Sequence, residues 1–541
     1  MLPASFSSAL LLVSLLPGPP EPEAPELREL AVIGSSVYDQ ARVQHILRLK
    51  PGDALRRSAA AFAASLEARY HSDGYIAARV SGAFDSTSAR LTLTVDEGRL
   101  GRIQTPGLDG AARERALAVL GLEPGSVVRE DAILDALARL EQVSHGALRP
   151  QGDPPYQLLA GDDNVQALRL RIAKPWAGLG AGLDGPGDTP FYDRVDGFAP
   201  YAGVEATLYD HRRYEHLNIY VRGRYGFASK HGRFALGVRR ALGPFELGYE
   251  FHDLSDTDDA FRASAIEEAL GTLLSMSSFR DVFERRGHEA YAFARVGARA
   301  QLGVSFRSDR YASLPVTEDS SLFRQDATPR PNPAVSPGSM GSLILTARWT
   351  SAPRLFDSPA EERESFLLRS LYGAATGPER GLRVEASYEI ASPSAFGGDF
   401  DFQRLLAQAR GRHWLSQRSS IAARVLLAVS GGSLPPQKQL ALGGLGTLRG
   451  YGFKEFSGDN MFLATAEWRH LAPFPLPSPV AFFDGGVTWT SPASSGFRSD
   501  VGLGLEWAPG GLGLRIDAAV PLDREPGGYD FRIMARLRAP F

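Results

Sequence analysis

From about Asp193 to the C-terminus, apolar and polar residues alternate with a period of two. The clearest run lies between Leu217 and Phe227, where apolar residues at odd positions alternate with polar or charged residues at even positions. Such alternation is typical of β-strands with one apolar and one polar face. Aromatic residues gather near strand ends on the apolar side, and the polar side carries charges of both signs. We therefore expect a transmembrane antiparallel β-barrel with a lipid-facing apolar band and a polar lumen.

The barrel is predicted to span residues 197–541 with about 16 strands, an even number as bacterial barrels generally have. The strand patterns lie near residues 197–208, 215–227, 233–241, 245–252, 287–296, 300–309, 341–350, 365–373, 380–391, 402–411, 419–430, 461–471, 479–489, 499–508, 511–520 and 529–541. Trp176–Leu183 is assigned to a hinge over residues 175–196, because counting it as a strand would make the number odd. Counting the strands in this order places segments 253–286 and 310–340 at the barrel end where connections between strands are normally short. The sequence does not explain why these two connections are long.

Residues 26–174 show helical patterns between short strands instead. Residues 26–99 read as strand, two helices and two strands, a β-α-α-β-β order, and residues 100–174 repeat it more weakly. The dipeptides Pro51-Gly52 and Pro124-Gly125 separate the two helices of each copy. We expect two small α/β domains of one type, with two unrelated α/β domains as the alternative. In the first domain the strands are predicted at Leu30–Ile33, Ile76–Val80 and Leu91–Val95 and the helices at Asp39–Leu49 and Leu55–His71.

Residues 1–24 are predicted to be a signal peptide. Ala9–Leu16 is an apolar stretch of suitable length, followed by the Pro-rich stretch Pro17–Pro25. No Lys or Arg precedes Arg28, so the usual positive segment is missing, and a disordered tail or a mis-set start is the alternative.

Composition narrows the chemistry. The chain has 541 residues, no Cys and a net charge of −3. The lack of Cys excludes a disulfide scaffold, a Zn–Cys site and a thiol nucleophile, and the charge gives no footprint for nucleic acid. No G-x-S-x-G nucleophile elbow occurs. No stretch of about 18 apolar residues is present either, so no membrane-spanning helix is expected. We predict a protein that is not an enzyme and has no catalytic residues, no metal site and no cofactor.

The most informative motif is Leu448-Arg449-Gly450-Tyr451, within the Gly-rich run Gly443–Gly452 between two strand patterns. A later strand contains Phe482-Phe483-Asp484-Gly485-Gly486, and alternation puts Phe482, Asp484 and Gly486 on its inward face. The strand before it turns Glu467 inward as well. Since a guanidinium matches carboxylates with a rigid fork of donors, we expect Asp484 and Glu467 to anchor Arg449 inside the lumen. A solvated loop arginine is the alternative.

The last strand pattern ends on an aromatic residue. Its outward face carries Phe531, Ile533, Leu537 and Phe541, and arginines occupy the inward face. Pro540 removes one donor from the ladder.

Together these features resemble the BamA/TamA superfamily of outer-membrane assembly and translocation barrels. Gly74-Tyr75 and Val95-Asp96-Glu97-Gly98 resemble POTRA domains, the periplasmic modules of that superfamily. The resemblance implies that the loop arginine contacts the strand positions of Asp484 and Glu467, and that the terminal strand is the signal read by the outer-membrane assembly machinery. It further implies that the seam between the first and last strands opens laterally. Two POTRA-like domains match the two-partner secretion transporters in number.

The function implied is capture of unfolded client proteins by the POTRA domains, followed by their insertion into, or translocation across, the outer membrane. The implied partners are an outer-membrane or secreted client, outer-membrane lipids and the assembly machinery, with the N-terminal domains in the periplasm. A passive channel or structural barrel without a client is the alternative, and an outer-membrane lipid hydrolase is a weaker one. The resemblance leaves open the client, the oligomeric state and the choice between insertion and secretion.

Overall fold

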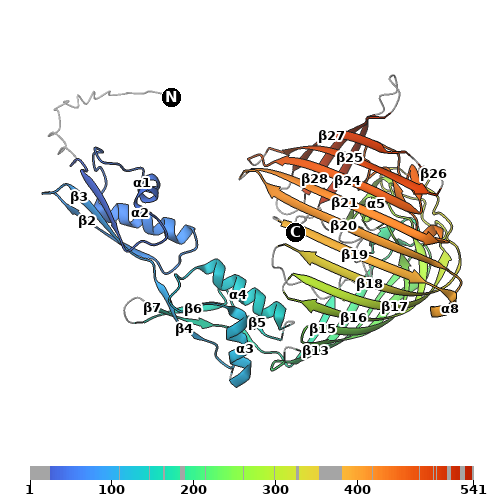
Figure 1. Cartoon of the computed structure of the whole chain (residues 1–541), viewed down its shortest axis with the longest axis horizontal. Helices are drawn as coiled ribbons and strands as arrows, with labels where there is room; N and C mark the ends of the chain where they lie inside the picture. The colour runs from blue at the N-terminus through green and yellow to red at the C-terminus, as the bar shows by residue number, and fades with distance from the viewer. Residues whose placement is uncertain are drawn as a thin grey trace, which may run out of the picture. The chain divides into compact units, whose positions relative to one another are not determined.

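The computed structural model describes residues 25–108, 110–144, 147–161, 165–182, 189–213, 215–259, 261–297, 299–324, 328–351, 381–416, 418–473, 476–491, 493–494, 496–507, 513–523 and 531–538. They form two compact units (Figure 1). The smaller unit extends to Leu140 and includes Pro150–Ala173, and the larger contains Glu141–Arg149 and everything from Lys174 onward. None of the described helices has the length and apolarity needed to cross a bilayer.

The first domain of the smaller unit packs two helices on a three-stranded sheet. Its elements are β1 (Glu29–Ile33), α1 (Gln40–Leu47), α2 (Ala59–Ser72), β2 (Arg79–Asp85) and β3 (Arg90–Asp96), with strand order β1-β3-β2. Asp39 and Ser58 cap the two helices by accepting backbone N–H groups. Phe62, Leu66 and Tyr70 follow helical spacing on α2 and are buried against the sheet. The predicted β-α-α-β-β order is therefore confirmed, although β2 begins at Arg79 because Ala78 closes a turn on Tyr75.

A buried carboxylate fixes how the chain leaves β1. Glu97 is 4% exposed and accepts the backbone N–H groups of Ser36 and Val37, each at 2.7 Å. It also accepts the hydroxyl groups of Ser36 and Tyr70. Successive backbone donors that converge on one anion hold the β1–α1 connection against the end of β3.

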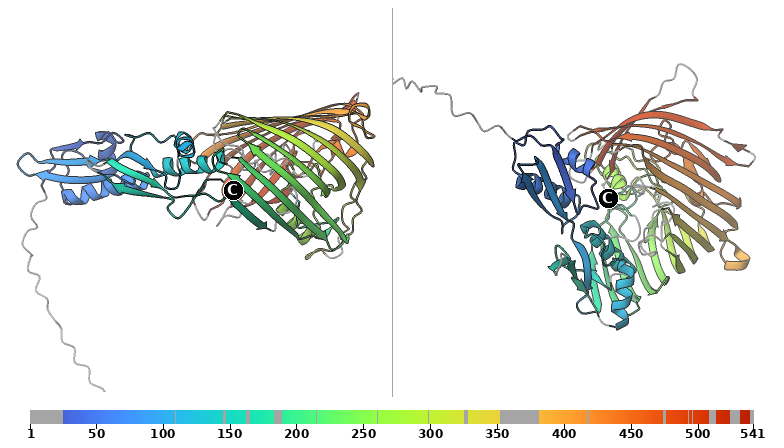
Figure 2. Two further views of the ribbon diagram at one scale, coloured as in Figure 1. Left: turned by 90° about the horizontal axis from the view of Figure 1, so that it is seen from below. Right: turned by 60° about the vertical axis from the view of Figure 1, so that its left-hand side comes forward.

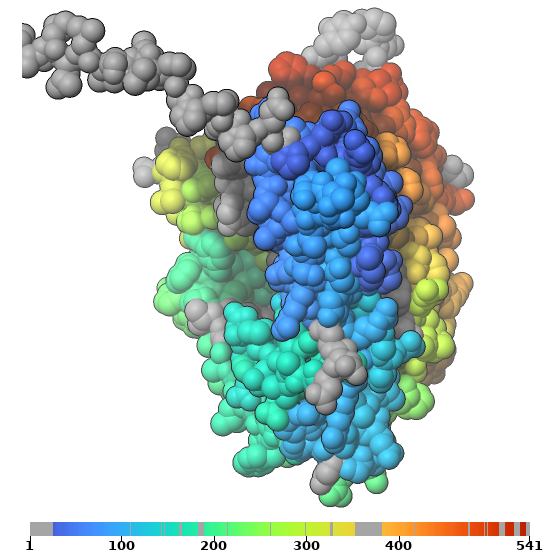
Figure 3. Space-filling model, turned by 90° about the vertical axis from the view of Figure 1, so that its left-hand side faces the viewer, coloured from blue at the N-terminus to red at the C-terminus, as the bar shows by residue number. Residues whose placement is uncertain are grey.

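The second domain repeats the plan. It contains β4 (Arg99–Gln104), α3 (Gly110–Leu120), α4 (Glu130–Val143), β6 (Tyr156–Ala160) and β7 (Val165–Leu170), with strand order β4-β7-β6. A short pair, β5 (Arg149–Pro150) with β8 (Ile172–Ala173), forms a separate two-stranded sheet. Figure 3 shows the surface of the smaller unit, coloured blue to cyan.

The larger unit is a closed antiparallel barrel (Figures 1 and 2). Of its seventeen described strands, β26 (Ala493–Ser494) has only two residues and pairs with the end of β25, which leaves sixteen. These are β9 (Ala177–Gly182), β12 (Tyr201–Asp210), β13 (Glu215–Gly226), β14 (His231–Leu242), β15 (Phe245–Asp256), β16 (Phe283–Val296), β17 (Ala300–Ser313), β18 (Gly338–Thr350), β19 (Gly381–Ala391), β20 (Phe402–Trp414), β21 (Ser419–Gly432), β24 (Asn460–His470), β25 (Ser478–Thr490), β27 (Arg498–Trp507), β28 (Gly513–Pro521) and β29 (Arg532–Arg538).

The barrel is apolar outside and polar inside. On β13, Ile219 and Val221 are 48% and 45% exposed, whereas Asn218 is 0% and Tyr220 6% exposed. In a water-soluble protein the exposed face of a sheet is polar and the buried face is apolar. Here the exposed face is apolar, as expected for a barrel whose outer surface contacts lipid. The predicted alternation, lumen and strand number are confirmed.

The assignment of individual strands was wrong in one place. Residues 175–196, predicted as a hinge, contain β9, which pairs with β12 over six residues and is the first strand of the barrel. The strand predicted at residues 365–373 lies outside the described residues, and the ladder passes directly from β18 to β19. The ladder gains β9 and has no strand between β18 and β19, so the total and the positions of later strands are unchanged.

Counting β9 also corrects the placement of the long connections. We call the end of the barrel where β9 stops the far end. The connections over residues 257–282 and 314–337 lie at this end, together with the connection that contains Arg449. The predicted segments 253–286 and 310–340 were therefore assigned to the wrong end, because omission of β9 reversed the direction of the following strands.

Replacing Glu97 by Ala is expected to destabilise residues 25–173 by roughly 1–3 kcal/mol, because buried donors of the β1–α1 connection lose their acceptor. The neighbouring Asp96 is exposed, so Asp96→Ala should change the free energy of unfolding by no more than about 0.5 kcal/mol. Urea denaturation followed by circular dichroism measures both. Equal effects of the two substitutions would contradict a structural role for Glu97.

Candidate functional site

The connection between β21 and β24 folds back into the barrel. It forms a small hairpin, β22 (Leu440–Leu442) with β23 (Phe456–Gly458), and the Gly-rich loop lies between these strands. Gly443, Gly444 and Gly446 have φ values of 109°, 81° and 77°, which only glycine adopts without strain. Leu448 and Tyr451 are 0% and 2% exposed and pack in an apolar cluster with residues of β20, β21 and β24.

Arg449 reaches three strands of the wall. Its Nε and Nη2 donate to the two carboxylate oxygens of Asp484 at 2.6 and 2.9 Å. Its Nη1 donates to Glu467 at 2.9 Å and to Asp517 at 3.1 Å. The guanidinium carbon also lies 3.4 Å from the centre of the Phe482 ring, so the two planes stack. Burial alone would lower the pKa of Arg449, but Asp484 and Glu467 raise that pKa above its usual value.

A second arginine completes the anchor from the wall itself. Arg515 on β28 is fully buried and donates two hydrogen bonds of 3.0 Å to Glu467. Its Nε donates to Asp517 at 2.6 Å. Glu467 and Asp517 therefore each join the loop arginine to an arginine of the wall, which ties β24, β25 and β28 to one loop side chain.

Neighbouring loop residues fit the wall closely. The Gly450 N–H donates to Asp500 on β27 at 2.9 Å, and a Cβ at Gly450 would lie 2.8 Å from the Asp500 Cβ. Tyr451 donates its hydroxyl to the Ser499 carbonyl at 3.1 Å. A Cβ at Gly486 would lie 2.8 Å from Leu442 of the hairpin. No larger residue fits at Gly450 or Gly486 unless the loop moves.

A second set of contacts comes from the β15–β16 connection, which contains α5 (Ala265–Ser275) inside the barrel (Figure 1). Arg262, just before α5, is 0% exposed and donates to the carbonyls of Ala441 and Gly443 and to the Thr447 hydroxyl. A Cβ at Gly446 would lie 2.7 Å from the Arg262 backbone. The loop is thus held between the barrel wall and the α5 connection.

Ion pairs join the α5 connection to the loop and to the other segments at the far end. Lys454 donates to both Asp259 and Asp281 at 2.6 Å. Burial opposes the effect, but Lys454 and Arg330 lower the pKa of Asp281 to about 2. Arg194, from the β9–β12 connection, donates to Asp281 at 2.9 Å. We call these far-end segments, which ion pairs join to one another, the plug.

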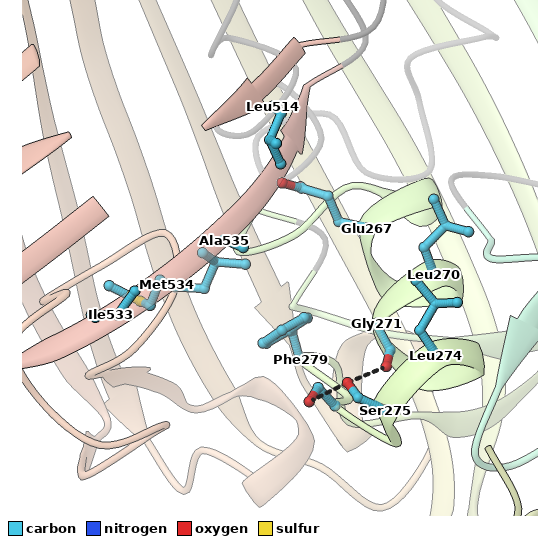
Figure 4. A pocket seen from close by; sticks show the side chains of 12 residues that line it. Glu267, Leu270, Gly271, Leu274, Ser275, Phe279, Leu514, Ile533, Met534 and Ala535 are labelled. Carbon is cyan, nitrogen blue, oxygen red and sulfur yellow. Dashed lines mark hydrogen bonds between the residues drawn. The ribbon is translucent and has the colours of Figure 1, made fainter. Parts of the chain in front are cut away.

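The inner face of the plug meets the last strands of the barrel. Glu267 of α5 lies 3.6 Å from the Nε of Arg536 on β29. Beside this contact is a largely apolar cavity of about 530 Å³ between α5 and β28–β29 (Figure 4). Leu270 and Leu274 line it from α5, and Met534 of β29 lines it from the barrel.

The structure brings together all the residues predicted for the loop motif and its anchor: Leu448, Arg449, Gly450, Tyr451, Glu467, Phe482, Asp484 and Gly486. In the predicted assembly signal, Phe531 and Ile533 are 63% and 64% exposed and face outward. Leu537 belongs to β29, its side chain is not described, and Phe541 lies outside the described residues.

Sequence reasoning missed Asp500, the contacts of Asp517 and Arg515 in the anchor, and the role of the α5 connection. The alternation of β28 does show Arg515 and Asp517 on one face, but it does not show which loop residue they meet. Arg262 carries no sequence signal, because its contact joins residues about 180 positions apart in the chain.

Arg449→Ala is expected to leave the barrel closed and to free the loop, because it strands buried carboxylates at a cost of roughly 3–5 kcal/mol. Trypsin cleavage after Lys454 in the purified protein measures the release. Arg449→Lys should restore protection only partly, since an ammonium does not span two carboxylates. Asp484→Ala should act similarly, and the double variant should be no worse than Arg449→Ala. Additive effects would mean that the two side chains do not act as a pair.

Arg262→Ala should also expose Lys454 to trypsin, because two buried backbone carbonyls lose their donor. The contacts of Arg262 and Arg449 are separate, so the free-energy effects of these two substitutions should add, unlike those at Arg449 and Asp484. Arg286→Ala is the matched control, since that side chain is 61% exposed. If Arg262→Ala cleaved no faster than Arg286→Ala, the α5 connection would not hold the loop.

Comparison with known proteins places this geometry in a family. The Omp85 superfamily domain matches residues 244–535, and the POTRA model, described as a surface antigen variable number repeat, matches residues 25–98. Among curated proteins, no sequence is similar enough to count as a match.

Solved structures similar to the chain include BamA from Haemophilus ducreyi lacking POTRA domains 1–3, with 14% identity, a TM-score of 0.44 and coverage of 95% of this chain and 100% of that one. CdiB from Escherichia coli has 19% identity, a TM-score of 0.41 and coverage of 98% and 93%. CdiB from Acinetobacter baumannii has 13% identity, a TM-score of 0.40 and coverage of 96% and 90%. The match to the Omp85 domain spans more than half of the sequence, and the chain therefore belongs to the Omp85 superfamily.

Proposed function

We propose that this chain is an outer-membrane protein that captures unfolded client proteins through periplasmic POTRA domains and inserts them into, or translocates them across, the outer membrane. The observation that carries the proposal is that one chain combines two features. The first is a POTRA sheet with an unpaired edge strand, and the second is a barrel with an apolar outer face and a plug in its lumen. The proposal assigns the chain no catalytic step, metal or cofactor.

The first domain offers an edge for an extended client. In its sheet order, β2 is an edge strand, and one of its long sides has no partner strand among the described residues. Its side chains at Arg79, Ser81, Ala83 and Asp85 are exposed. An extended peptide added to such an edge gains main-chain hydrogen bonds without a specific side-chain pocket, which suits clients of differing sequence.

The barrel offers a weak place in its wall. Among the described residues, the first strand β9 has six residues and the last strand β29 has seven, whereas the other long strands have 9–14. β9 shares six residue pairs with β12, while β16 and β17 share fourteen. β9 is therefore held to its neighbour β12 by fewer residue pairs, and we propose that the wall opens beside this strand to admit a client strand.

The filled lumen disfavours a passive channel. Arg194, Arg262 and Arg280 of the plug are at most 1% exposed, and the loop side chains around Arg449 are buried. An open aqueous pore would leave such side chains in contact with water. In the proposed function, the plug closes the route until a client engages.

Photocrosslinking in cells tests the proposal. A photoreactive residue at Ser81 or Ala83 should trap unfolded outer-membrane or secreted proteins, because those positions lie on the edge strand. The same residue at Ala68, exposed on α2, should trap far less. The crosslinked protein should stay in the outer-membrane fraction after carbonate extraction and run heat-modifiably on gels. Equal trapping from Ala68, or extraction by carbonate, would contradict the proposal.

A further inference from the structure

The anchor of Arg449 contains more acidic groups than basic ones. Four carboxyl groups from four strands converge beneath the loop, and two guanidiniums meet them: Glu467, Asp484, Asp500 and Asp517 against Arg449 and Arg515. Three of the carboxyl groups are fully buried. Arg424 of β21 also interacts electrostatically with Asp484 and Glu467. Four carboxylates would therefore face three guanidiniums in a largely buried space, and the excess negative charge would be repulsive.

Asp500 is the carboxyl group that neither arginine reaches. The Nε and Nη2 groups of Arg449 both donate to Asp484, and the Nε group of Arg515 donates to Asp517. The only donor on Asp500 within the described part of the chain is the Gly450 N–H, which binds its Oδ2. The other oxygen, Oδ1, is buried and receives no hydrogen bond from any described residue.

The ladder places a second carboxylate directly against Asp500. Asp484 and Asp500 are directly paired residues of β25 and β27, so their side chains lie next to each other on one face of the sheet. Two like charges at such a position destabilise a sheet. On its other side Asp500 pairs with Pro521, which has no N–H to donate.

The other charged side chains around this cluster make hydrogen bonds or ion pairs with groups other than Asp500. Arg424 of β21 donates to the Gly446 carbonyl at 2.6 Å, and Arg469 of β24 pairs with Glu506 at 2.8 Å. Arg498 of β27 pairs with Asp523 at 2.6 Å, and Arg536 of β29 lies against Glu267. None of these contacts brings a donor to the Asp500 Oδ1.

We propose that Asp500 is a positioning residue that holds the Arg449 loop as a neutral carboxylic acid. Its Oδ1 carries a proton and donates it to a carboxylate oxygen of Asp484, while its Oδ2 accepts the Gly450 N–H. One proton removes the repulsion between Asp484 and Asp500, supplies the orphaned oxygen with a hydrogen bond, and leaves Asp484 ionised for Arg449. This assignment concerns how the loop is held, and it stands whether or not the proposed client function is correct.

The proposal predicts how the opening of the loop depends on pH. When the loop leaves the lumen, water reaches Asp500 and its proton is released. The closed state binds one more proton than the open state, so the loop is held firmly at low pH and released as pH rises. A single linked proton changes the opening equilibrium by up to about tenfold per pH unit.

Because the chain has no native Cys, one introduced thiol reports on the loop. Ala441→Cys places it where the side chain is 6% exposed, and maleimide labels it only when the loop opens. Ser457→Cys, at an exposed position of the same hairpin, corrects for the intrinsic pH dependence of the thiol. The labelling ratio of the two reporters should rise by about tenfold or more between about pH 6 and about pH 9 in the otherwise native chain.

Three variants in the reporter background decide the proposal. Asp500→Asn copies the neutral acid, keeping an acceptor for Gly450 and a donor for Asp484, so its ratio should stay low and independent of pH. Asp500→Ala should give a high ratio at every pH. Asp523→Asn, which loses a partly exposed ion pair, should behave like the unmodified chain. Heat-modifiable migration confirms that each barrel is folded.

Two results would overturn the proposal. The first is an Asp500→Asn variant that labels as fast as Asp500→Ala, which would show that the loop needs a charged carboxylate. The second is an Asp500→Asn variant that keeps the full pH dependence, which would place the linked proton elsewhere. Both results concern the loop alone, so they are separate from any failure to trap a client.

Discussion

The guanidinium of Arg449 is 3% exposed and surrounded by carboxylates, and it joins the loop to three strands of the barrel wall. Moving a guanidinium out of water is favourable only if its donors meet acceptors of good geometry. Here the donors meet Asp484, Glu467 and Asp517 on three strands, and the planar group also stacks on Phe482. The barrel wall must therefore keep these strands in register. The loop must likewise bring glycine, the only residue that fits, to the wall beside Arg449.

One anchor would not be enough to order a connection of this length. The ends of the loop meet in the β22–β23 hairpin, but three glycines at positive φ give the unfolded loop many alternative conformations. Arg262 donates hydrogen bonds to backbone carbonyls of the loop on the side away from the barrel wall. Lys454, near the C-terminal end of the loop, pairs with Asp259 and Asp281. The loops of the plug therefore stabilise one another. The loop that contains Arg449 contacts both the rest of the plug and the barrel wall.

The parts of this arrangement that follow from strand periodicity could be predicted from the sequence. A period of two determines which residues share a face, so the inward positions of Asp484 and Glu467 follow from alternation alone. β9 was missed because its sequence, Ala-Gly-Leu-Gly-Ala-Gly, has only one large side chain and cannot show alternation. Arg262 and Asp500 were missed for a different reason. Their partners depend on how loops fold within the lumen, and no local pattern encodes such contacts.

The position of the anchor around the barrel links the loop to the weakest part of the wall. Asp517 and Arg515 lie on β28, whose next neighbour is the short last strand β29. Arg515 is paired across this ladder with Arg536, which contacts Glu267 of α5. β28 and β29 are therefore held from inside by both components of the plug, the loop through Asp517 and the α5 connection through Arg536. Withdrawal of the loop would remove the Arg449 guanidinium from Asp517, whereas the contact of Arg515 with Asp517 would remain. The same group of charge pairs therefore positions the loop and holds β28, the neighbour of the last strand, from inside the barrel.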